Sequence, residues 1–138
     1  MTTRVSTRVT TAMLRGLQRL GADPDELCRD IGADPEALRA ADSRVSVAVL
    51  ARLWLSAERM LRDPMIGLHT AEAIGPSGLF HYLTMTQSTV GRGIASLISS
   101  TRLASDNLVM TLDRAPATTV IGIHFSSSLP LALSSRPA

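Results

Sequence analysis

The side chains best suited to chemistry are two histidines and a glutamate in the middle of the chain. His69 and Glu72 lie three residues apart, so they share one face of a helix, and His81 follows twelve residues after His69. Imidazole nitrogens and carboxylate oxygens ligate zinc when a third ligand converges on the ion. Two such residues on one helix face are common by chance, and an ordinary surface pair explains them better. We therefore expect no metal site and no cofactor.

Two candidate nucleophiles lack the surroundings that activate one. Gly75-Pro76-Ser77-Gly78 resembles the start of a nucleophile elbow, but Leu79 stands where that motif requires glycine, and a helix is expected before it. Cys28 lies on a short amphipathic segment with no histidine nearby in the sequence. A loop serine and a small core cysteine are the better interpretations, so we expect no enzymatic activity.

Phosphate binding is also poorly supported. Gly91-Arg92-Gly93 lacks the preceding strand and the further glycine of a nucleotide-binding loop. The first three expected helices could be mistaken for a helix-turn-helix, but the segment 34–39 that would enter the groove is short and begins with acids. All fourteen basic residues are arginine, and twelve interspersed acids leave a net charge of +2. We therefore expect no direct binding of nucleic acid, which needs basic residues gathered on one face.

Apolar spacing and start signals predict the first three helices that would position these residues. Apolar residues at helical spacing predict a helix near residues 9–20 that ends at Gly21. The near-copies at 21–27 and 32–38 each place an aspartate at the N-cap and a proline at the first helical position. Two short helices should therefore begin at Asp23-Pro24 and Asp34-Pro35.

The longest apolar pattern should form the central helix, capped by Ser46. Its expected inward face holds Leu50, Leu53, Trp54, Ala57, Met60 and Leu61, and its expected outward face holds Arg52, Ser56 and Arg59. Asp63-Pro64 should start a further helix that continues to Ile74, and residues 79–86 should form a buried helix. Ser88 and Thr89 should cap a helix that carries Ile94, Leu97, Ile98 and Thr101 on one face.

The hydrophobic period changes after that helix. Leu108, Met110 and Leu112 alternate with their neighbours, and a β-branched run follows the turn at 114–117, so we predict a β-hairpin. The fold class is therefore mostly α (α+β), a bundle of about six short helices followed by a β-hairpin. One domain should span residues 1–125, and residues 126–138 should be a disordered tail, because they hold two prolines and no sustained periodicity.

The compartment follows from cysteine usage and from apolar runs. Cys28 is the single cysteine, so no internal disulfide can form and a reducing compartment is expected. Neither a signal-peptide core nor a run approaching the roughly 20 apolar residues of a membrane span occurs. We expect a cytoplasmic protein with no membrane association.

With the elements placed, the chain from about Leu14 to Phe125 resembles the N-terminal, arabinose-binding-type domain of AraC-family bacterial transcription regulators. Five blocks of sequence, in the family's order, and then the closing helix and hairpin carry the resemblance. The blocks are Leu20-Gly21-Ala22-Asp23-Pro24, Arg44-Val45-Ser46-Val47, Asp63-Pro64-Met65-Ile66-Gly67-Leu68-His69, Gly78-Leu79-Phe80-His81-Tyr82-Leu83 and Ser88-Thr89-Val90. The sequence departs from the family at Gly91 and Gly93 and in its Ser/Pro-rich end.

The resemblance implies a sensor and oligomerisation module that precedes a DNA-binding domain. Because members of the family continue into a pair of helix-turn-helix units, we expect an incomplete, truncated or frameshifted regulator. Its partners would be a second copy or a related regulator, together with a small-molecule effector. The alternative is a stand-alone helical interaction module that pairs with a full-length regulator or another partner, and an unrecognised small enzyme comes third. Trp54, His81 and Tyr82 are expected in the core, so the effector-binding residues remain unknown.

Overall fold

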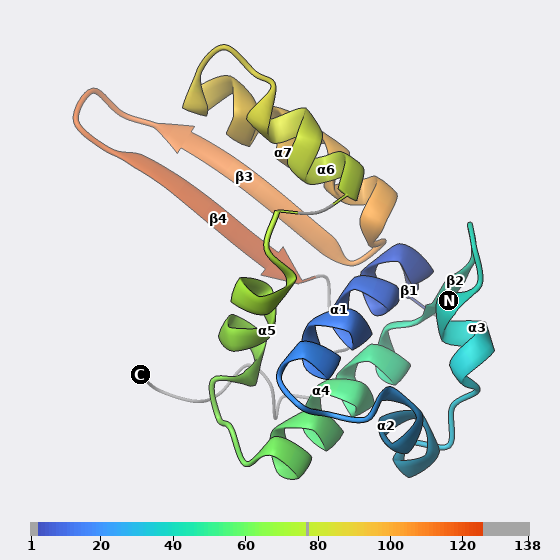
Figure 1. Ribbon diagram of the computed structural model, residues 1–138. Helices are drawn as coiled ribbons and strands as arrows, with labels where there is room; N and C mark the ends of the chain where they lie inside the picture. The colour runs from blue at the N-terminus through green and yellow to red at the C-terminus, as the bar shows by residue number, and fades with distance from the viewer. Residues whose placement is uncertain (1–2, 77, 126–138) are drawn as a thin grey trace. The chain divides into compact units, whose positions relative to one another are not determined.

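The computed structural model describes residues 3–76 and 78–125, which divide into two compact units. Unit 1 comprises the described residues up to Gly75, and unit 2 those from Pro76 onwards. Figure 1 colours both units along the chain. The predicted single domain 1–125 spans both units and stays a prediction. The predicted tail at 126–138 lies outside the described residues.

Unit 1 consists of five helices and a pair of very short strands. In chain order they are β1 (Arg4–Ser6), α1 (Thr7–Arg19), α2 (Pro24–Asp30), α3 (Pro35–Arg39), β2 (Arg44–Ser46), α4 (Val47–Leu61) and α5 (Ile66–Ile74). Helix α1 contacts α2, α3 and α5, and α4 contacts α2 and α5. The core they share includes Met13, Leu14, Leu17, Leu27, Cys28, Leu53, Ala57 and Ile66.

The repeated Gly-Ala-Asp-Pro sequence forms the same structure twice, as predicted. Gly21 and Gly32 follow α1 and α2 with φ of 97° and 65°, a region that glycine enters without steric cost. Asp23 Oδ1 then accepts a hydrogen bond from Asp25 N at 2.9 Å, and Asp34 Oδ1 accepts one from Glu36 N at 3.0 Å. At the third Asp-Pro sequence, Asp63 Oδ1 accepts from Met65 N at 2.9 Å, but α5 begins only at Ile66.

A second repeat, Arg-Val-Ser, forms a strand pair that was not predicted from the sequence. Arg4-Val5-Ser6 and Arg44-Val45-Ser46 pair as antiparallel strands, with Val5 opposite Val45. Each strand leads directly into a helix whose N-cap is its own serine, so Ser6 caps α1 and Ser46 caps α4. Two backbone hydrogen bonds of 3.0 Å, from Thr7 N to Ser43 O and from Val47 N to Thr3 O, extend the pairing. The starts of α1 and α4 are thereby tied together.

The predicted inward face of α4 is confirmed, but its outward face needs one correction. Leu53 and Ala57 are fully buried, and Trp54 packs half-buried against the core. Arg52 and Arg59 are exposed as expected, whereas Ser56 is 1% exposed. Ser56 is buried because α2 packs over this side of α4, and its hydroxyl donates a hydrogen bond to Asp30 there.

Unit 2 consists of two helices and a hairpin. They are α6 (Gly78–Met85), α7 (Val90–Ala104), β3 (Leu108–Arg114) and β4 (Thr119–Phe125). The predicted cap of α7 is confirmed, because Thr89 Oγ1 accepts a hydrogen bond from Arg92 N at 3.2 Å. Gly93 lies where an added Cβ would be 2.8 Å from Thr84 O, so α6 and α7 approach closely there.

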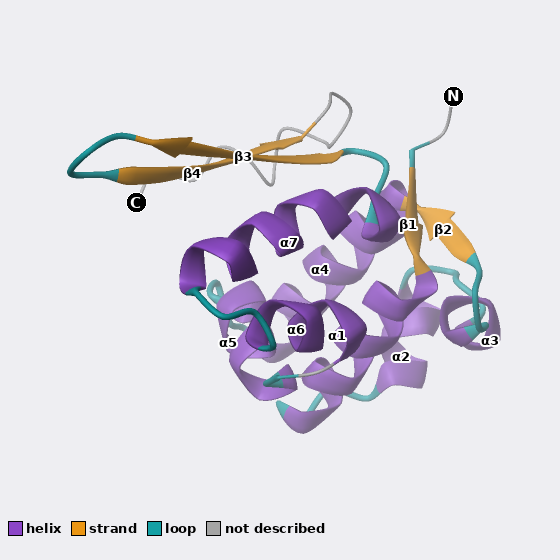
Figure 2. Cartoon of the chain, turned by 90° about the horizontal axis from the view of Figure 1, so that it is seen from above, coloured by secondary structure: helices purple, strands orange, loops and turns teal. Residues whose placement is uncertain are grey.

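The predicted hairpin is confirmed, with β3 and β4 antiparallel and Met110 opposite Ile123. Helix α7 packs along β3, as Figures 1 and 2 both show, and Thr101 Oγ1 donates to Met110 Sδ at 3.5 Å. Because side chains alternate along strands, one face of the hairpin is apolar except for Arg114 and Thr119 at its turn end. We call it the apolar hairpin face, and it comprises Leu108, Met110, Leu112, Ile121, Ile123 and Phe125.

The predicted burial of α6 is found only in part, because Phe80, His81 and Leu83 are half-buried. The helix itself forms over almost the predicted residues, but Tyr82 and Met85 are 66% and 69% exposed. Trp54 packs against the core as expected, whereas Tyr82 does not. The apolar composition of this segment therefore indicated a helix correctly, but it overestimated the burial of Tyr82 and Met85.

The predicted fold class is confirmed. The described residues form seven helices, of which the last two belong to unit 2, and an antiparallel strand pair follows the last helix. None of the helices in the described ranges is both long enough and apolar enough to cross a membrane.

Candidate functional site

The histidine singled out by the sequence is part of a local ion pair. His69 Nδ1 lies 2.6 Å from Asp63 Oδ2, and Oδ1 of the same carboxylate accepts a hydrogen bond from the Met65 backbone N–H. The hydrogen bond to Asp63 raises the pKa of His69, and the same bond lowers the pKa of Asp63. His81 belongs to unit 2. Among residues 3–76 and 78–125, no three His, Cys, Asp or Glu side chains are grouped to hold a metal.

The other sequence candidates have structural roles or lie outside the described residues. Cys28 is fully buried in the core, and burial raises the pKa of its thiol, which disfavours the nucleophilic thiolate. Ser77 lies outside the described residues. Gly91 and Gly93 lie in the first turns of α7, after a helix and not after a strand. Helix α3, the supposed DNA-reading helix, is five residues long.

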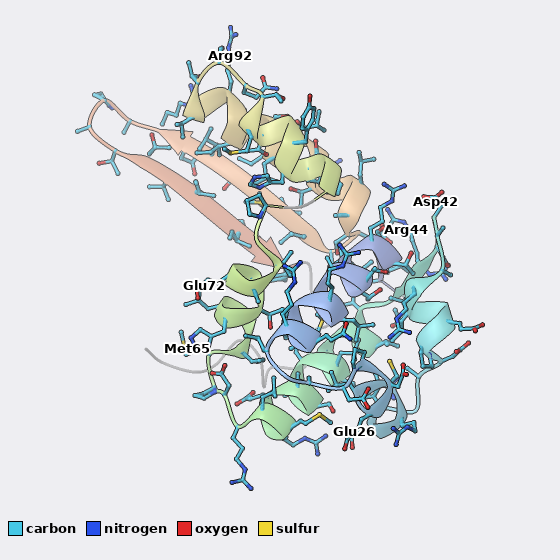
Figure 3. The ribbon with its side chains drawn as sticks, viewed as in Figure 1. Glu26, Asp42, Arg44, Met65, Glu72 and Arg92 are labelled. Atoms are coloured by element: carbon cyan, nitrogen blue, oxygen red, sulfur yellow. The ribbon has the colours of Figure 1, made fainter. Side chains whose placement is uncertain are left out.

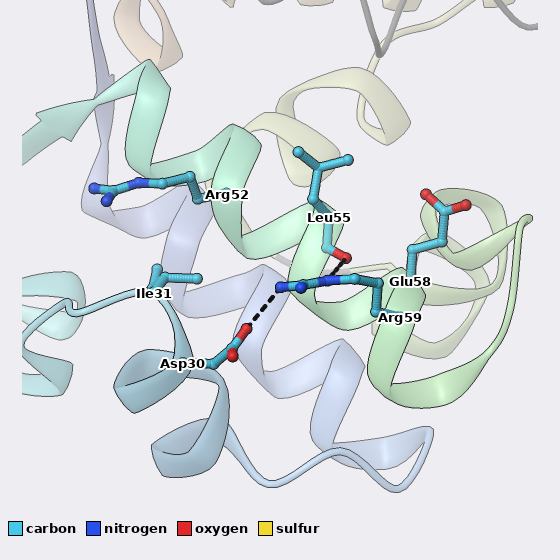
Figure 4. A pocket seen from close by; sticks show the side chains of 6 residues that line it. All are labelled: Asp30, Ile31, Arg52, Leu55, Glu58 and Arg59. Atoms are coloured by element: carbon cyan, nitrogen blue, oxygen red, sulfur yellow. Dashed lines mark hydrogen bonds and ion pairs between the residues drawn. The ribbon is translucent and has the colours of Figure 1, made fainter.

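An open groove of about 550 Å³ lies between α2 and α4 in unit 1. Its lining combines two arginines, two acids and two aliphatic side chains, shown in Figure 4: Asp30, Ile31, Arg52, Leu55, Glu58 and Arg59. The end of α2 supplies the first two, and one face of α4 supplies the rest. This volume falls within the range of small-molecule sites, which is roughly 300–1,000 Å³.

Asp30 is the best-fixed polar side chain in this groove. Its Oδ2 accepts a hydrogen bond from Ser56 Oγ at 2.6 Å and another from Arg59 Nη2 at 2.9 Å. The Arg59 guanidinium also donates through Nε to Leu55 O at 3.4 Å. Because Ser56 is buried and its rotation is restricted, the Asp30 carboxylate holds a defined position at the groove wall.

Arg52 differs from Arg59, although both lie on the same helix and line the same groove. In the part of the chain that the structure describes, Arg52 makes no hydrogen bond or ion pair. Figure 4 shows its guanidinium on the Ile31 side of the groove, well away from the Asp30–Arg59 pair and from the Glu58 carboxylate. A fixed ion pair and an available cation therefore share one groove.

A second, smaller groove of about 330 Å³ lies between α7 and β3 in unit 2. Its walls are the side chains of Ile98, Ser99, Thr101, Arg102, Leu108, Val109 and Met110. Arg102 is the one charged side chain among them, and carboxylates are absent from this lining. The α2–α4 groove, with charges of both signs, offers more means to orient a small ligand.

The groove residues were missed because they belong to two helices that the sequence does not pair. Arg52, Ser56 and Arg59 were correctly placed on one face of one helix, and that face was assigned to solvent. A buried serine and a cation at positions i and i+3, opposite an acid on another helix, is a recognisable pattern once the packing is known. No local pattern in the sequence predicts the packing of α2 on α4.

Charges elsewhere are dispersed over the surface. Figure 3 shows Glu26, Asp42 and Glu72 extending outward from different elements of unit 1. Arg8 pairs with Asp42 at 2.8 Å, and Arg39 pairs with Asp25 at 3.4 Å. Exposed pairs of this kind add little stability, but they leave basic side chains mixed with acids.

These features define the class: a mostly helical α+β protein with an open, charge-lined groove in its helical unit. The chain belongs to the family of N-terminal arabinose-binding domains of AraC transcription regulators, whose sequence pattern matches residues 21–136. The resemblance stated from the sequence is thus confirmed. That family is a regulatory ligand-binding domain and not an enzyme family. No curated protein matches the chain.

Proposed function

We propose that this chain senses a small-molecule effector for an AraC-type regulator, and that the effector binds in the α2–α4 groove. The observation that carries the proposal is the groove itself, in which a fixed ion pair, an available arginine and two aliphatic side chains line about 550 Å³. Membership of a regulatory ligand-binding family supports it. The word arabinose in the family's description does not identify the effector of this chain.

Thermal unfolding of the whole chain with a panel of sugars, polyols, amino acids and organic acids tests this proposal. A ligand that binds only the folded state stabilises it by RT ln(1 + [L]/Kd), about 2.7 kcal/mol at a hundredfold excess over Kd. We expect at least one class of compound to raise the melting temperature in a concentration-dependent way. A panel that leaves the melting temperature unchanged would contradict effector sensing.

We also propose that the chain associates with a second copy or a related regulator through the apolar hairpin face. The half of that face contributed by β4 is open, with Ile121, Ile123 and Phe125 exposed to 44%, 57% and 58%. Exposed apolar patches on a small protein mark interaction surfaces. Strand β4 pairs with β3 alone among the described strands, so its outer edge also offers backbone groups for pairing.

Three further expectations accompany this function. We propose that residues 1–125 act as one sensing and association domain and that the segment 126–138 is dispensable for the fold. We also propose that the chain acts in the cytoplasm and does not bind DNA itself. Mixed surface charge and the acidic start of α3 support the last point. A gel shift with the chain and its promoter region at physiological salt checks it, and the expected result is no sequence-selective shift.

A further inference from the structure

We infer that the α2–α4 groove takes a small organic carboxylate with a short aliphatic portion, and that Arg52 binds the carboxylate. This inference rests on the proposed function and names the chemical class of the effector. It departs from a neutral sugar because the polar group still available in the groove is a cation.

The guanidinium of Arg52 is chemically suited to bind a carboxylate. Guanidinium groups bind carboxylates in a planar, two-hydrogen-bond geometry that neutral hydroxyl groups do not match. Arg59, about two turns further along α4, already donates to Asp30 and Leu55. Arg52 has no such partner within the described residues, so its donors are available to an incoming anion.

Two aliphatic side chains, Ile31 and Leu55, line the groove together with Arg52. Ile31 follows the last residue of α2 and is 8% exposed, and Leu55 lies three residues after Arg52 on α4. Positions three apart share a helix face, so Arg52 and Leu55 border the same stretch of groove. An aliphatic chain that packs on Leu55 and Ile31 can therefore present its carboxylate to Arg52.

Two acids, Asp30 and Glu58, also line this groove. Asp30 would repel a carboxylate if it were uncompensated, but Ser56 and Arg59 both donate to its Oδ2. Glu58 points away from Arg52 towards the far end of the groove (Figure 4). The negative groups are thus paired or distant, and the Arg52 end of the groove is the positive end.

Calorimetric titration of the whole chain at pH 7 with hexanoate and with hexanamide tests the inference. The two probes share an aliphatic chain, and only hexanoate carries the charge. We expect saturable binding of hexanoate with a Kd on the order of a millimolar, and binding of hexanamide at least roughly tenfold weaker, because only the carboxylate accepts charge-assisted hydrogen bonds from the guanidinium.

Arg52→Gln supplies the second arm, with Arg15→Gln as its matched control. Both arginines are exposed and unpaired among the described residues, both lie on helices, and only Arg52 lines the groove. Arg52→Gln should weaken hexanoate binding roughly tenfold to a hundredfold with an unchanged melting temperature, and Arg15→Gln should leave binding unchanged. Arg52→Lys should retain part of the affinity, because the charge remains and the fork geometry is lost.

Equal binding of the two probes, no binding of hexanoate, or undiminished binding by Arg52→Gln would each overturn the inference. The thermal panel separates these results from failure of the proposed function. A neutral compound that stabilises the wild type and Arg52→Gln equally overturns the carboxylate assignment and leaves effector sensing intact. A panel without any stabilising compound overturns both.

Discussion

At the residue scale, unit 1 contains buried hydroxyl groups in two different states. Thr10 Oγ1 donates to Leu38 O at 2.6 Å and Thr7 Oγ1 donates to Ala40 O at 2.7 Å, which ties α1 to the end of α3. Thr70 is equally buried on α5, but its Oγ1 has no hydrogen-bond partner among the described residues. A buried hydroxyl without a partner costs stability, whereas a satisfied one contributes to it.

Replacement of these threonines by valine should therefore change stability in opposite directions. Valine keeps the branched shape and removes the hydroxyl. We expect Thr70→Val to raise the free energy of unfolding by up to about 1 kcal/mol, and Thr10→Val to lower it by about 1–3 kcal/mol because the Leu38 carbonyl loses its donor. Urea unfolding of both variants measures this. A Thr70→Val variant as unstable as Thr10→Val would mean that the Thr70 hydroxyl is bonded in solution.

The Asp63–His69 pair should make stability depend on pH. The pKa of His69 is raised from 6.5, so its contribution is complete below pH 6.5 and is lost as the pH rises through the folded pKa. The pKa of Asp63 is lowered from 3.8, so its contribution is present above pH 3.8 and is lost as the pH falls through the folded pKa. The pair therefore stabilises unit 1 most between these two ordinary values.

Melting curves between pH 5 and pH 8 for the wild type and His69→Gln check this expectation. The advantage of the wild type should shrink as the pH rises, since deprotonated His69 no longer carries charge opposite Asp63 and Glu72. Asp63→Asn, which keeps an oxygen for the Met65 N–H, should remove most of the same pH dependence. An advantage that stays constant across this range would show that the histidine contributes through packing alone.

At the element scale, close approach between helices depends on glycine at two places. In unit 1, a Cβ on Gly16 of α1 would be 2.7 Å from Ile74 Cγ1 and 3.0 Å from Thr70 O of α5. In unit 2, Gly93 of α7 approaches the Thr84 carbonyl of α6 in the same way. The helix-weakening effect of glycine is outweighed in both units by the contact that it permits.

Gly16→Ala should destabilise the protein by roughly 1–2 kcal/mol, because overpacking costs about 1–3 kcal/mol and helix propensity returns up to about 1 kcal/mol. Gly67→Ala is the matched control on α5, where an added Cβ meets nothing within 4 Å. It should stabilise by up to about 1 kcal/mol from propensity alone. Thermal unfolding compares the two, and a stabilising Gly16→Ala would contradict the packing of α1 on α5.

The elements that the sequence predicted well are those specified by neighbouring residues. Asp23, Asp34 and Thr89 cap helices through bonds to amides two or three residues away, so spacing alone identifies them. The β1–β2 pair was missed because its strands are short and separated by 40 residues. The groove was missed for the same physical reason, since Ser56 and Asp30 meet only through the packing of α2 on α4.

At the scale of the whole molecule, the two units divide the proposed work. Unit 1 contains the larger core and the α2–α4 groove, and unit 2 carries the apolar hairpin face. A hairpin with an open apolar face is marginal without further cover. We therefore propose that ligand binding belongs to unit 1 and association to unit 2.

Ile123→Lys and Val120→Lys form a matched pair that tests association. The two side chains are similarly exposed, at 57% and 55%, but Ile123 lies on the apolar hairpin face and Val120 on the opposite face. Ile123→Lys should increase the fraction of monomer in light scattering, and Val120→Lys should leave it near that of the wild type. A wild type that is a uniform monomer at about 100 μM, where open strand edges associate, would contradict the proposal.

Effector binding between α2 and α4, as proposed here, is tested most directly by one NMR titration. The ¹⁵N-labelled whole chain is titrated with the compound that raises its melting temperature most. We expect amide shift changes to saturate together and to centre on Asp30, Ile31, Arg52 and Leu55, which line the groove. Saturating changes centred instead on Ile98, Thr101 and Met110, which line the groove of unit 2, would contradict binding between α2 and α4.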